Sequence, residues 1–228
     1  MYKNIEILDK KKHNKTKFSN VDALEVAKHI GIVPLGVDEV LDMSCVAPVL
    51  ISGGEIGEFI AFTGISEKVT LYKNSEHYLP RFVQTYPFLN IVVKNENNNY
   101  NTVVAIDNDK KYVGMKKQNS ILSKNGELEK IASEKIELVK RLDQQRNISK
   151  IIIKELQKLD LLIQKNLKIK TKEGEQTIIE EFYIINKEKL VKLDDAILAN
   201  WARKGWMGII DAHIKSLNNF QKVLVNQQ

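Results

Sequence analysis

Proline and glycine are distributed unevenly along this chain of 228 residues, and their distribution limits the folds that it can adopt. All four prolines and six of the eleven glycines lie within the first 90 residues, and no proline follows Pro87. Proline ends helices and central strands, and glycine permits tight turns, so the front of the chain is predicted to form short elements. We expect an α+β fold, with an antiparallel curled sheet and short helices in the N-terminal part and a helix-rich C-terminal half.

Short apolar runs between turn residues predict the strands of the front part. The stretches 5–9 and 68–72 each predict one strand, and the arms 49–51 and 59–62 predict a hairpin that turns at glycines 53, 54 and 57. A second hairpin is predicted from the runs 90–93 and 102–106, with an asparagine-rich turn between them. Pro34 favours an extended segment, and Asp38 is predicted to be the N-cap of a short helix that ends before Pro48.

Helical periodicity dominates from Glu127 onward. An apolar stripe runs from Leu128 to Ile163, and the polar residues around Asn147 leave open whether 127–163 is one helix or two. A β-hairpin is predicted near 166–185, followed by two helical stripes that Gly205 separates. We expect a β-rich portion at 1–115 and a helical portion at 116–228, joined in one continuous domain.

Composition excludes several classes of protein. A hydrophobic share of 43% is enough for a packed core, and the single cysteine, Cys45, excludes an internal disulfide. Cys45 is predicted to be a small buried residue. No apolar run reaches the ~18 residues of a membrane span, and the charged N-terminal segment lacks the apolar core of a secretory signal. We therefore expect a cytoplasmic protein, with leaderless export to the cell surface left open.

The net charge of +6 is concentrated in one part of the chain. Residues 110–172 hold 17 Lys and Arg against 7 Asp and Glu, whereas the remainder holds 18 against 22. We expect most of these lysines to lie on the long helix, where they alternate with glutamates, and such mixed charge is typical of a solvated face. The segment has no zinc-finger or helix-turn-helix pattern, which disfavours nucleic-acid binding.

Motifs for catalysis, cofactors and metals are missing from the sequence. The four histidines lack the spacing of a metal site, and no phosphate-binding or dinucleotide-binding loop is present. His213 and Ser216, three residues apart on one predicted helix, form a candidate polar pair. A hydrolytic nucleophile also needs an orienting acid and an oxyanion hole, and neither accompanies them. We predict no catalytic residue, no cofactor and no metal, and interpret His213 as a core histidine with Ser216 as its partner.

The stretch 77–88, HYLPRFVQTYPF, gathers two of the four prolines with several aromatic residues. Pro80 and Pro87 would start and stop a short helix of about two turns, with Phe88 entering the next strand. We interpret the stretch as a clamp between strands. Its polar rim is the candidate edge for a ligand or partner, and the residues of this edge are His77, Tyr78, Arg81 and Tyr86.

The landmarks of this chain, taken in order, resemble the SapC family of bacterial proteins. They are a Leu-Asp pair before a basic run that ends in His, a Val-Pro-Leu segment, a strand that ends in Gly, a Tyr-Pro-Phe stretch, a strand that ends in Ile-Asp, and a closing helix with His and Ser. The matching residues are Leu8, Asp9, Lys10–Lys12, His13, Val33, Pro34, Leu35, Glu39, Pro48, Phe59–Gly64, Pro80, Tyr86, Pro87, Phe88, Ile106, Asp107, Gly126, His213 and Ser216. Family members often carry arginine just before Tyr-Pro-Phe, where this chain has Gln84 and Thr85.

The resemblance implies a link to bacterial surface layers and no settled reaction. Our first hypothesis is a non-enzymatic accessory protein that binds a protein partner, such as a surface-layer protein or its export machinery. It predicts an exposed apolar patch, and a homo-oligomer is compatible with it. The alternative is an enzyme that modifies a protein or peptide, which requires a pocket near His77, Arg81 and Tyr86 or near His213 and Ser216. A third reading, binding of an anionic surface or nucleic acid through 110–172, is the weakest.

Overall fold

The computed structural model describes residues 2–73, 77–94, 98–171 and 174–225. It has an α+β fold whose C-terminal half is rich in helix, which confirms the fold class expected from the sequence. The chain divides into two compact units, and each unit is made of two separate stretches of sequence. Unit 1 comprises residues 1–29 and 81–144, and unit 2 comprises residues 30–80 and 145–228. The expectation of one continuous domain stays a prediction.

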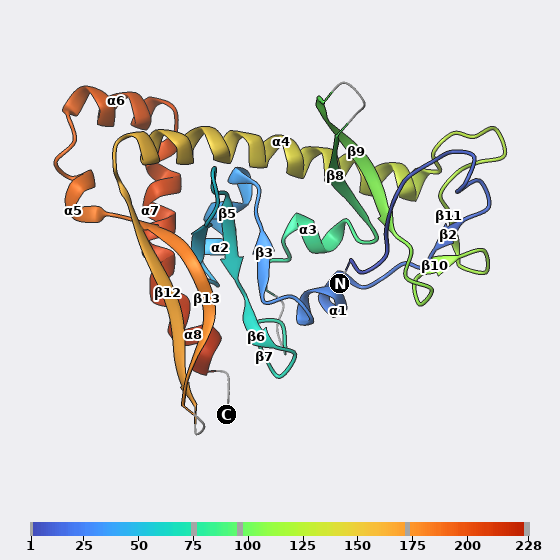
Figure 1. Ribbon diagram of the computed structural model, residues 1–228, viewed down its shortest axis with the longest axis horizontal. Coiled ribbons are helices and arrows are strands. Elements are labelled where there is room, and N and C mark those ends of the chain that lie inside the picture. Colours follow the sequence, from blue (N-terminus) through green and yellow to red (C-terminus); the bar gives the residue numbers. More distant parts are fainter. Residues whose placement is uncertain (1, 74–76, 95–97, 172–173, 226–228) are drawn as a thin grey trace. The chain divides into compact units, whose positions relative to one another are not determined.

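Unit 1 contains two small antiparallel sheets (Figure 1). The first has the order β1-β9-β8, with β1 (Ile5–Ile7), β9 (Tyr100–Asp107) and β8 (Phe88–Lys94). The second has the order β10-β2-β11, with β10 (Val113–Gly114), β2 (Lys17–Phe18) and β11 (Asn119–Ser120). The helices of this unit are α1 (Ala23–Lys28), α3 (Arg81–Gln84) and the first half of α4 (Lys130–Lys158).

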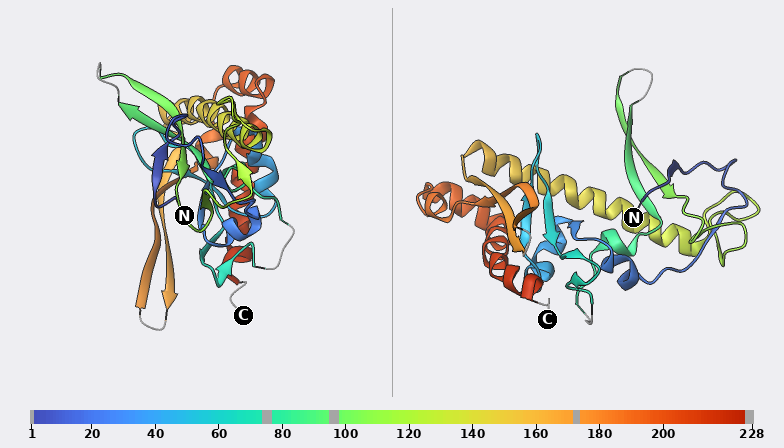
Figure 2. Two further views of the ribbon diagram at one scale, coloured as in Figure 1. Left: turned by 90° about the vertical axis from the view of Figure 1, so that its right-hand side faces the viewer. Right: turned by 60° about the horizontal axis from the view of Figure 1, so that its bottom comes forward.

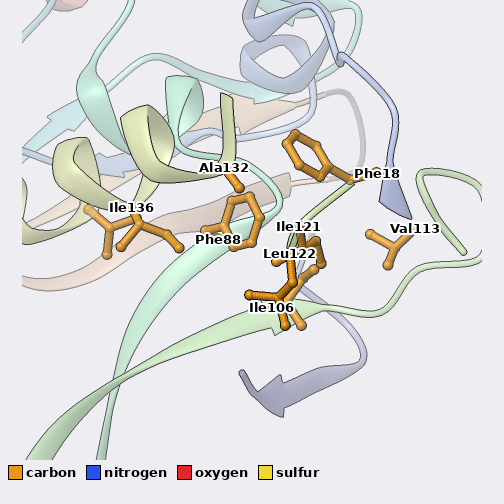
Figure 3. Close-up of a cluster of buried hydrophobic side chains, with 9 residues drawn as sticks. Phe18, Phe88, Ile106, Val113, Ile121, Leu122, Ala132 and Ile136 are labelled. Carbon is orange, nitrogen blue, oxygen red and sulfur yellow. The ribbon is translucent and has the colours of Figure 1, made fainter. Parts of the chain in front are cut away.

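The core of unit 1 forms where α4 packs against these strands. Aromatic and aliphatic side chains spaced along β8, β9 and the first turns of α4 point inward, because residues at i, i+4 and i+7 share one face of a helix. Figure 3 shows the ring of Phe88 beside Ala132 and Ile136 of α4. The buried cluster consists of Phe18, Phe88, Ile106, Val113, Ile121, Leu122, Ala132, Ile136 and Val139.

Unit 2 contains a five-stranded antiparallel sheet with the order β12-β13-β4-β5-β3. Its strands are β12 (Leu162–Thr171), β13 (Gly174–Ile185), β4 (Val49–Ser52), β5 (Phe59–Phe62) and β3 (Ile32–Pro34). The strands β6 (Gly64–Ser66) and β7 (Val69–Thr70) form a separate pair. Its helices include the second half of α4, η1 (Val37–Glu39), α2 (Val40–Ser44), α5 (Lys187–Leu190), α6 (Asp195–Arg203), α7 (Trp206–Ser216), η2 (Leu217–Asn219) and α8 (Phe220–Val225).

The C-terminal helices of unit 2 cover its sheet. Phe220 of α8 contacts Phe62 of β5 and Phe182 of β13, with ring centroids 5.8 and 6.3 Å apart. Figure 2 shows α7 and α8 beside the strands β12 and β13 of this unit. Gly205, between α6 and α7, has φ of 73°, a left-handed conformation that glycine adopts without steric cost. This agrees with its predicted role as a break between two helices.

Most strands lie where the sequence predicts them. The hairpins β4–β5, β8–β9 and β12–β13 are all present, although residues 95–97 and 172–173 of two predicted turns lie outside the described residues. A side chain on Gly57 would approach the carbonyl oxygen of Ser52 to 2.6 Å, so the β4–β5 turn requires this glycine. The strand expected at 68–72 is shorter than predicted, because only Val69–Thr70 pairs.

The long helix is a single element. α4 runs without a break from Lys130 to Lys158, so the polar residues near Asn147 do not interrupt it. The prediction that the apolar stripe is helical was wrong at both of its ends. Leu128 forms an isolated bridge before the helix, and Ile163 belongs to β12. Both residues continue the helical spacing by coincidence, since apolar strand residues also recur at short intervals.

Three local predictions were also wrong. Asp38 was predicted to be an N-cap, but it lies inside the short helix η1. The N-cap of η1 is Gly36, and the N-cap of α2 is Glu39. Cys45 is exposed, because it follows the last turn of α2 on the solvent side. The helix in the 77–88 stretch has one turn rather than two, because α3 ends at Gln84 and the chain turns before Pro87.

Candidate functional site

The predicted ligand edge of the 77–88 stretch divides between the two units. His77 and Tyr78 belong to unit 2, and Arg81 and Tyr86 belong to unit 1. Arg81 starts α3, directly after Pro80, and only 9% of its surface is exposed. His77 and Tyr78 are half-buried, and Tyr86 is buried. Two of the four residues therefore present little surface to a ligand.

Tyr78 is part of a buried hydrogen-bond network in unit 2. Its hydroxyl donates to Oε1 of Glu39 at 2.9 Å, and Oε2 of Glu39 accepts the main-chain N–H of Gly36 at 2.9 Å. Glu39 is fully buried. The hydroxyl of Tyr72, whose pKa is raised by burial, donates to the carbonyl oxygen of Tyr78 at 3.1 Å. This network holds the turn before η1 and gives Tyr78 a structural role.

Replacing Tyr78 by phenylalanine is expected to lower the free energy of unfolding by about 2 kcal/mol. The change removes a hydrogen bond to the buried carboxylate of Glu39, and a hydrogen bond to a charged group contributes more to stability than one between neutral groups. Urea unfolding followed by circular dichroism measures the loss. Tyr100→Phe is the control, because Tyr100 is 71% exposed. Equal stability of both variants would contradict the assigned role.

Tyr86 is part of a second network, in unit 1. Its hydroxyl donates to Oδ2 of Asp107 at 3.3 Å, and the same carboxylate accepts the main-chain N–H groups of Asn4 and Lys3 at 3.0 and 3.3 Å. The pKa of Tyr86 is raised, chiefly by burial and next by the charge of Asp107, so its hydroxyl stays a donor. The ring also contacts Tyr2 edge-on, at 5.4 Å between centroids. Tyr86 thus fixes the segment before β1 against the end of β9.

His213 and Ser216 connect α7 to two strands of the unit 2 sheet. Nε2 of His213 accepts the main-chain N–H of Ile185 in β13 at 3.1 Å, which places the ring proton on Nδ1. The Ser216 hydroxyl accepts the N–H of Val49 in β4 at 2.9 Å and donates to the carbonyl oxygen of His213 at 2.6 Å. The bond between the two residues therefore involves the main chain of His213 and not its ring.

The environment of His213 keeps its ring neutral. His213 and Ser216 are both fully buried. Burial lowers the pKa of His213 to about 4, and the nearby main chain of Val49 opposes this shift. A neutral ring suits the acceptor role toward Ile185, because a protonated imidazole has no acceptor. The pair fastens a helix to a sheet, and a substrate would have no access to either side chain.

A surface that the sequence prediction did not single out lies on the sheet β1-β9-β8 of unit 1. Successive strand residues point to opposite faces, and the register places Ile7, Ala105 and Leu89 in one row and Val103 and Ile91 in the next. We call this the aliphatic face. Its aliphatic members are Ile5, Ile7, Leu89, Ile91, Val93, Val103 and Ala105, and the buried Asp107 lies opposite Ile5 at one end of the same face.

The aliphatic face is accessible at several positions. Ile5 and Ile7 are 44% and 49% exposed, and Leu89, Ile91, Val93 and Val103 are half-buried. The other face of the sheet carries Phe88 and Ile106, which belong to the core of unit 1. The sequence indicates that this sheet has apolar side chains on both faces. The segments 90–93 and 102–106 are almost continuous apolar runs, whereas a strand with one solvated face alternates apolar and polar residues.

Within the ranges 2–73, 77–94, 98–171 and 174–225, no group of three or more His, Cys, Asp or Glu side chains could hold a metal ion. No helix in these ranges is both long and apolar enough to cross a membrane.

Comparison with known proteins identifies a family. The family model described as SapC matches residues 8–223, which is nearly the whole chain. This match confirms the resemblance seen in the sequence. No curated protein and no solved structure matches the chain.

Proposed function

The chain belongs to the SapC family, and from this we propose that it is a non-enzymatic accessory protein that binds a protein partner in bacterial surface-layer protein production or export. The partner is a surface-layer protein before its export, or a component of the export machinery. The proposed compartment is the cytoplasm. The family resemblance supports the link to surface layers, and the aliphatic face supports the binding role.

The aliphatic face is the observation that supports a binding role. Isoleucines that are nearly half exposed and lie beside other aliphatic side chains are typical of surfaces that bind another protein. The strand β8 lies at the edge of the same sheet, so an extended segment of the partner could pair with it while its side chains pack on the aliphatic face. An unfolded polypeptide awaiting export has such extended apolar segments.

The test is titration calorimetry of this protein with the surface-layer protein of the same bacterium. The surface-layer protein is kept unfolded and is diluted just before the titration. We expect a dissociation constant in the micromolar range for the unaltered chain. The double variant Ile7→Lys, Ile91→Lys places two charges on the aliphatic face and is expected to weaken binding at least 10-fold, since each removes an apolar contact of about 1 kcal/mol or more.

Val92→Lys is the matched control. Val92 is 66% exposed and lies between Ile91 and Val93 on the opposite face of the same strand, so its replacement adds charge without touching the aliphatic face. The control is expected to bind like the unaltered chain. Absence of association at micromolar concentrations would count against the proposed function, and equal weakening by Val92→Lys would remove the aliphatic face as the site.

The alternative function, an enzyme acting on a protein or peptide, finds less support in the geometry. One of its two proposed centres, His213 and Ser216, is fully buried, with its ring nitrogen Nε2 and hydroxyl used by main-chain groups. In the other, near His77, Arg81 and Tyr86, Arg81 is only 9% exposed and the hydroxyl of Tyr86 binds the buried carboxylate of Asp107. A reacting group must approach its substrate to hydrogen-bond distance, and these side chains serve the fold instead.

A further inference from the structure

Two lysine-rich segments, far apart in the sequence, carry more than the whole net charge of the protein. Residues 9–19 and 109–124 together contain ten lysines and two aspartates, whereas the entire chain has a net charge of +6. Fewer than half of the 17 basic residues at 110–172 lie on α4, which corrects the expectation that most of them do. The concentration of charge therefore lies outside the long helix.

The fold brings these two segments together in unit 1. The strand β2 pairs with β10 on one side and with β11 on the other, so Lys17 lies opposite both Gly114 and Ser120. The N–H of Ile121 also donates to the carbonyl oxygen of Thr16 at 3.2 Å. Figures 1 and 2 show the dark blue loop before β2 beside the yellow-green loops around β10 and β11.

The lysines of these segments face solvent. We call them the lysine patch. Eight are exposed and two, Lys17 and Lys117, are half-buried. The two aspartates of the same segments, Asp9 and Asp109, accept main-chain N–H groups at turns. Glu6, just outside, is paired with Lys12 at 2.6 Å. The exposed members are Lys10, Lys11, Lys12, Lys15, Lys110, Lys111, Lys116 and Lys124.

One apolar side chain stands within this patch. Met115 follows β10, is 72% exposed and is followed directly by Lys116 and Lys117. An exposed apolar residue beside lysines suits a membrane interface, where the apolar group enters the boundary of the acyl chains and the ammonium groups remain among the phosphates. Neither segment contains arginine, the residue that recognises phosphates of nucleic acids by paired hydrogen bonds.

We propose that the lysine patch and Met115 bind the surface of a bilayer rich in anionic phospholipid. The lysines supply attraction that depends on the summed charge, and Met115 adds a shallow apolar contact. This inference is independent of the proposed protein partner, and its test contains only the chain and lipid. A failure of the vesicle test leaves the proposed function intact, and a failure to bind the proposed protein partner leaves this inference intact.

The test is sedimentation of the full chain with vesicles of phosphatidylglycerol and phosphatidylcholine, compared with vesicles of phosphatidylcholine alone. Binding is expected only to the anionic vesicles and is expected to weaken as salt rises. The variant Lys10→Gln, Lys11→Gln, Lys110→Gln, Lys116→Gln is expected to lose roughly 100-fold in affinity or more, because each lysine near the surface contributes about a fivefold factor. Met115→Ser is expected to lose about fivefold.

The control removes the same charge from unit 2. Lys154→Gln, Lys158→Gln, Lys187→Gln, Lys192→Gln changes four exposed lysines and is expected to lose less than about threefold. Circular dichroism checks that all variants fold. Three outcomes would overturn the proposal. The first is no binding of the unaltered chain to anionic vesicles, and the second is an equal loss of affinity in the control. The third is unchanged vesicle binding of Met115→Ser, together with tighter binding of the unaltered chain to DNA or polyglutamate than to vesicles.

Discussion

Replacing Phe88 by alanine is expected to lower the free energy of unfolding by about 4 kcal/mol, the largest loss that we expect from a single change in unit 1. Phe88 is fully buried, and its ring packs edge-on against Phe18 at 5.2 Å between centroids. The cavity left by alanine would open between β8 and α4 (Figure 3). Helix α4 and the strands cannot close it without breaking other contacts of the cluster.

Urea unfolding by circular dichroism, together with hydrogen exchange of the β9 amides, measures this effect. Tryptophan fluorescence would not suffice, because Trp201 and Trp206 both belong to unit 2. Phe88→Leu is expected to cost less than about 2 kcal/mol, since it retains most of the volume. Val92→Ala, at an exposed position on the same strand, is expected to change stability by less than about 0.5 kcal/mol. A loss below 1 kcal/mol for Phe88→Ala would show that this core is not closely packed.

Acidification is expected to destabilise the protein by about 3 kcal/mol through His213 alone. The pKa of His213 is about 4 in the folded chain, against an ordinary value near 6.5 when the chain is unfolded. Between these two values the unfolded chain binds a proton that the folded chain does not bind. The contribution is therefore complete above about pH 6.5 and is lost as the pH falls toward 4.

The comparison with His213→Gln isolates this contribution, because carboxylates also titrate near pH 4. The glutamine variant is expected to be less stable at pH 7 and to lose stability less steeply between pH 6.5 and 4. His29→Gln is the matched control because it removes an exposed histidine, and an equal change of slope in both variants would show that burial of His213 is not the cause. Parallel stability curves for the unaltered chain and His213→Gln would falsify the neutral, buried state of this ring.

The local sequence pattern was sufficient to predict most helices and strands, but not the distant residues that each of them contacts. Glycines and apolar runs located β4–β5 and β8–β9, since turn chemistry and strand pattern are encoded within a few residues. The bond of Ser216 to Val49 joins residues 167 positions apart, and no local pattern specifies it. The sequence therefore indicated that His213 lies in a core without indicating that its ring accepts from Ile185.

The surfaces were harder to predict than the core for the same reason. Lys10–Lys12 and Lys116 belong to segments that look unrelated in the sequence, and only the pairing of β2 with β10 and β11 places them on one patch. The exposure of Cys45 depends on where α2 ends, because Cys45 follows the last residue of that helix, Ser44. The aliphatic face could have been predicted more easily, because its strands are apolar runs in which apolar and polar residues do not alternate.

The interleaved order of the two units affects synthesis on the ribosome. Unit 1 lacks α4 until residue 144 has been translated, and unit 2 cannot place α7 against β4 until the last part of the chain emerges. Contacts between residues so distant in sequence form late and slowly. The nascent protein must therefore leave the apolar side chains of the β4–β5 hairpin uncovered by α7 and α8 for most of its translation, and a chaperone acting at this stage would bind this hairpin.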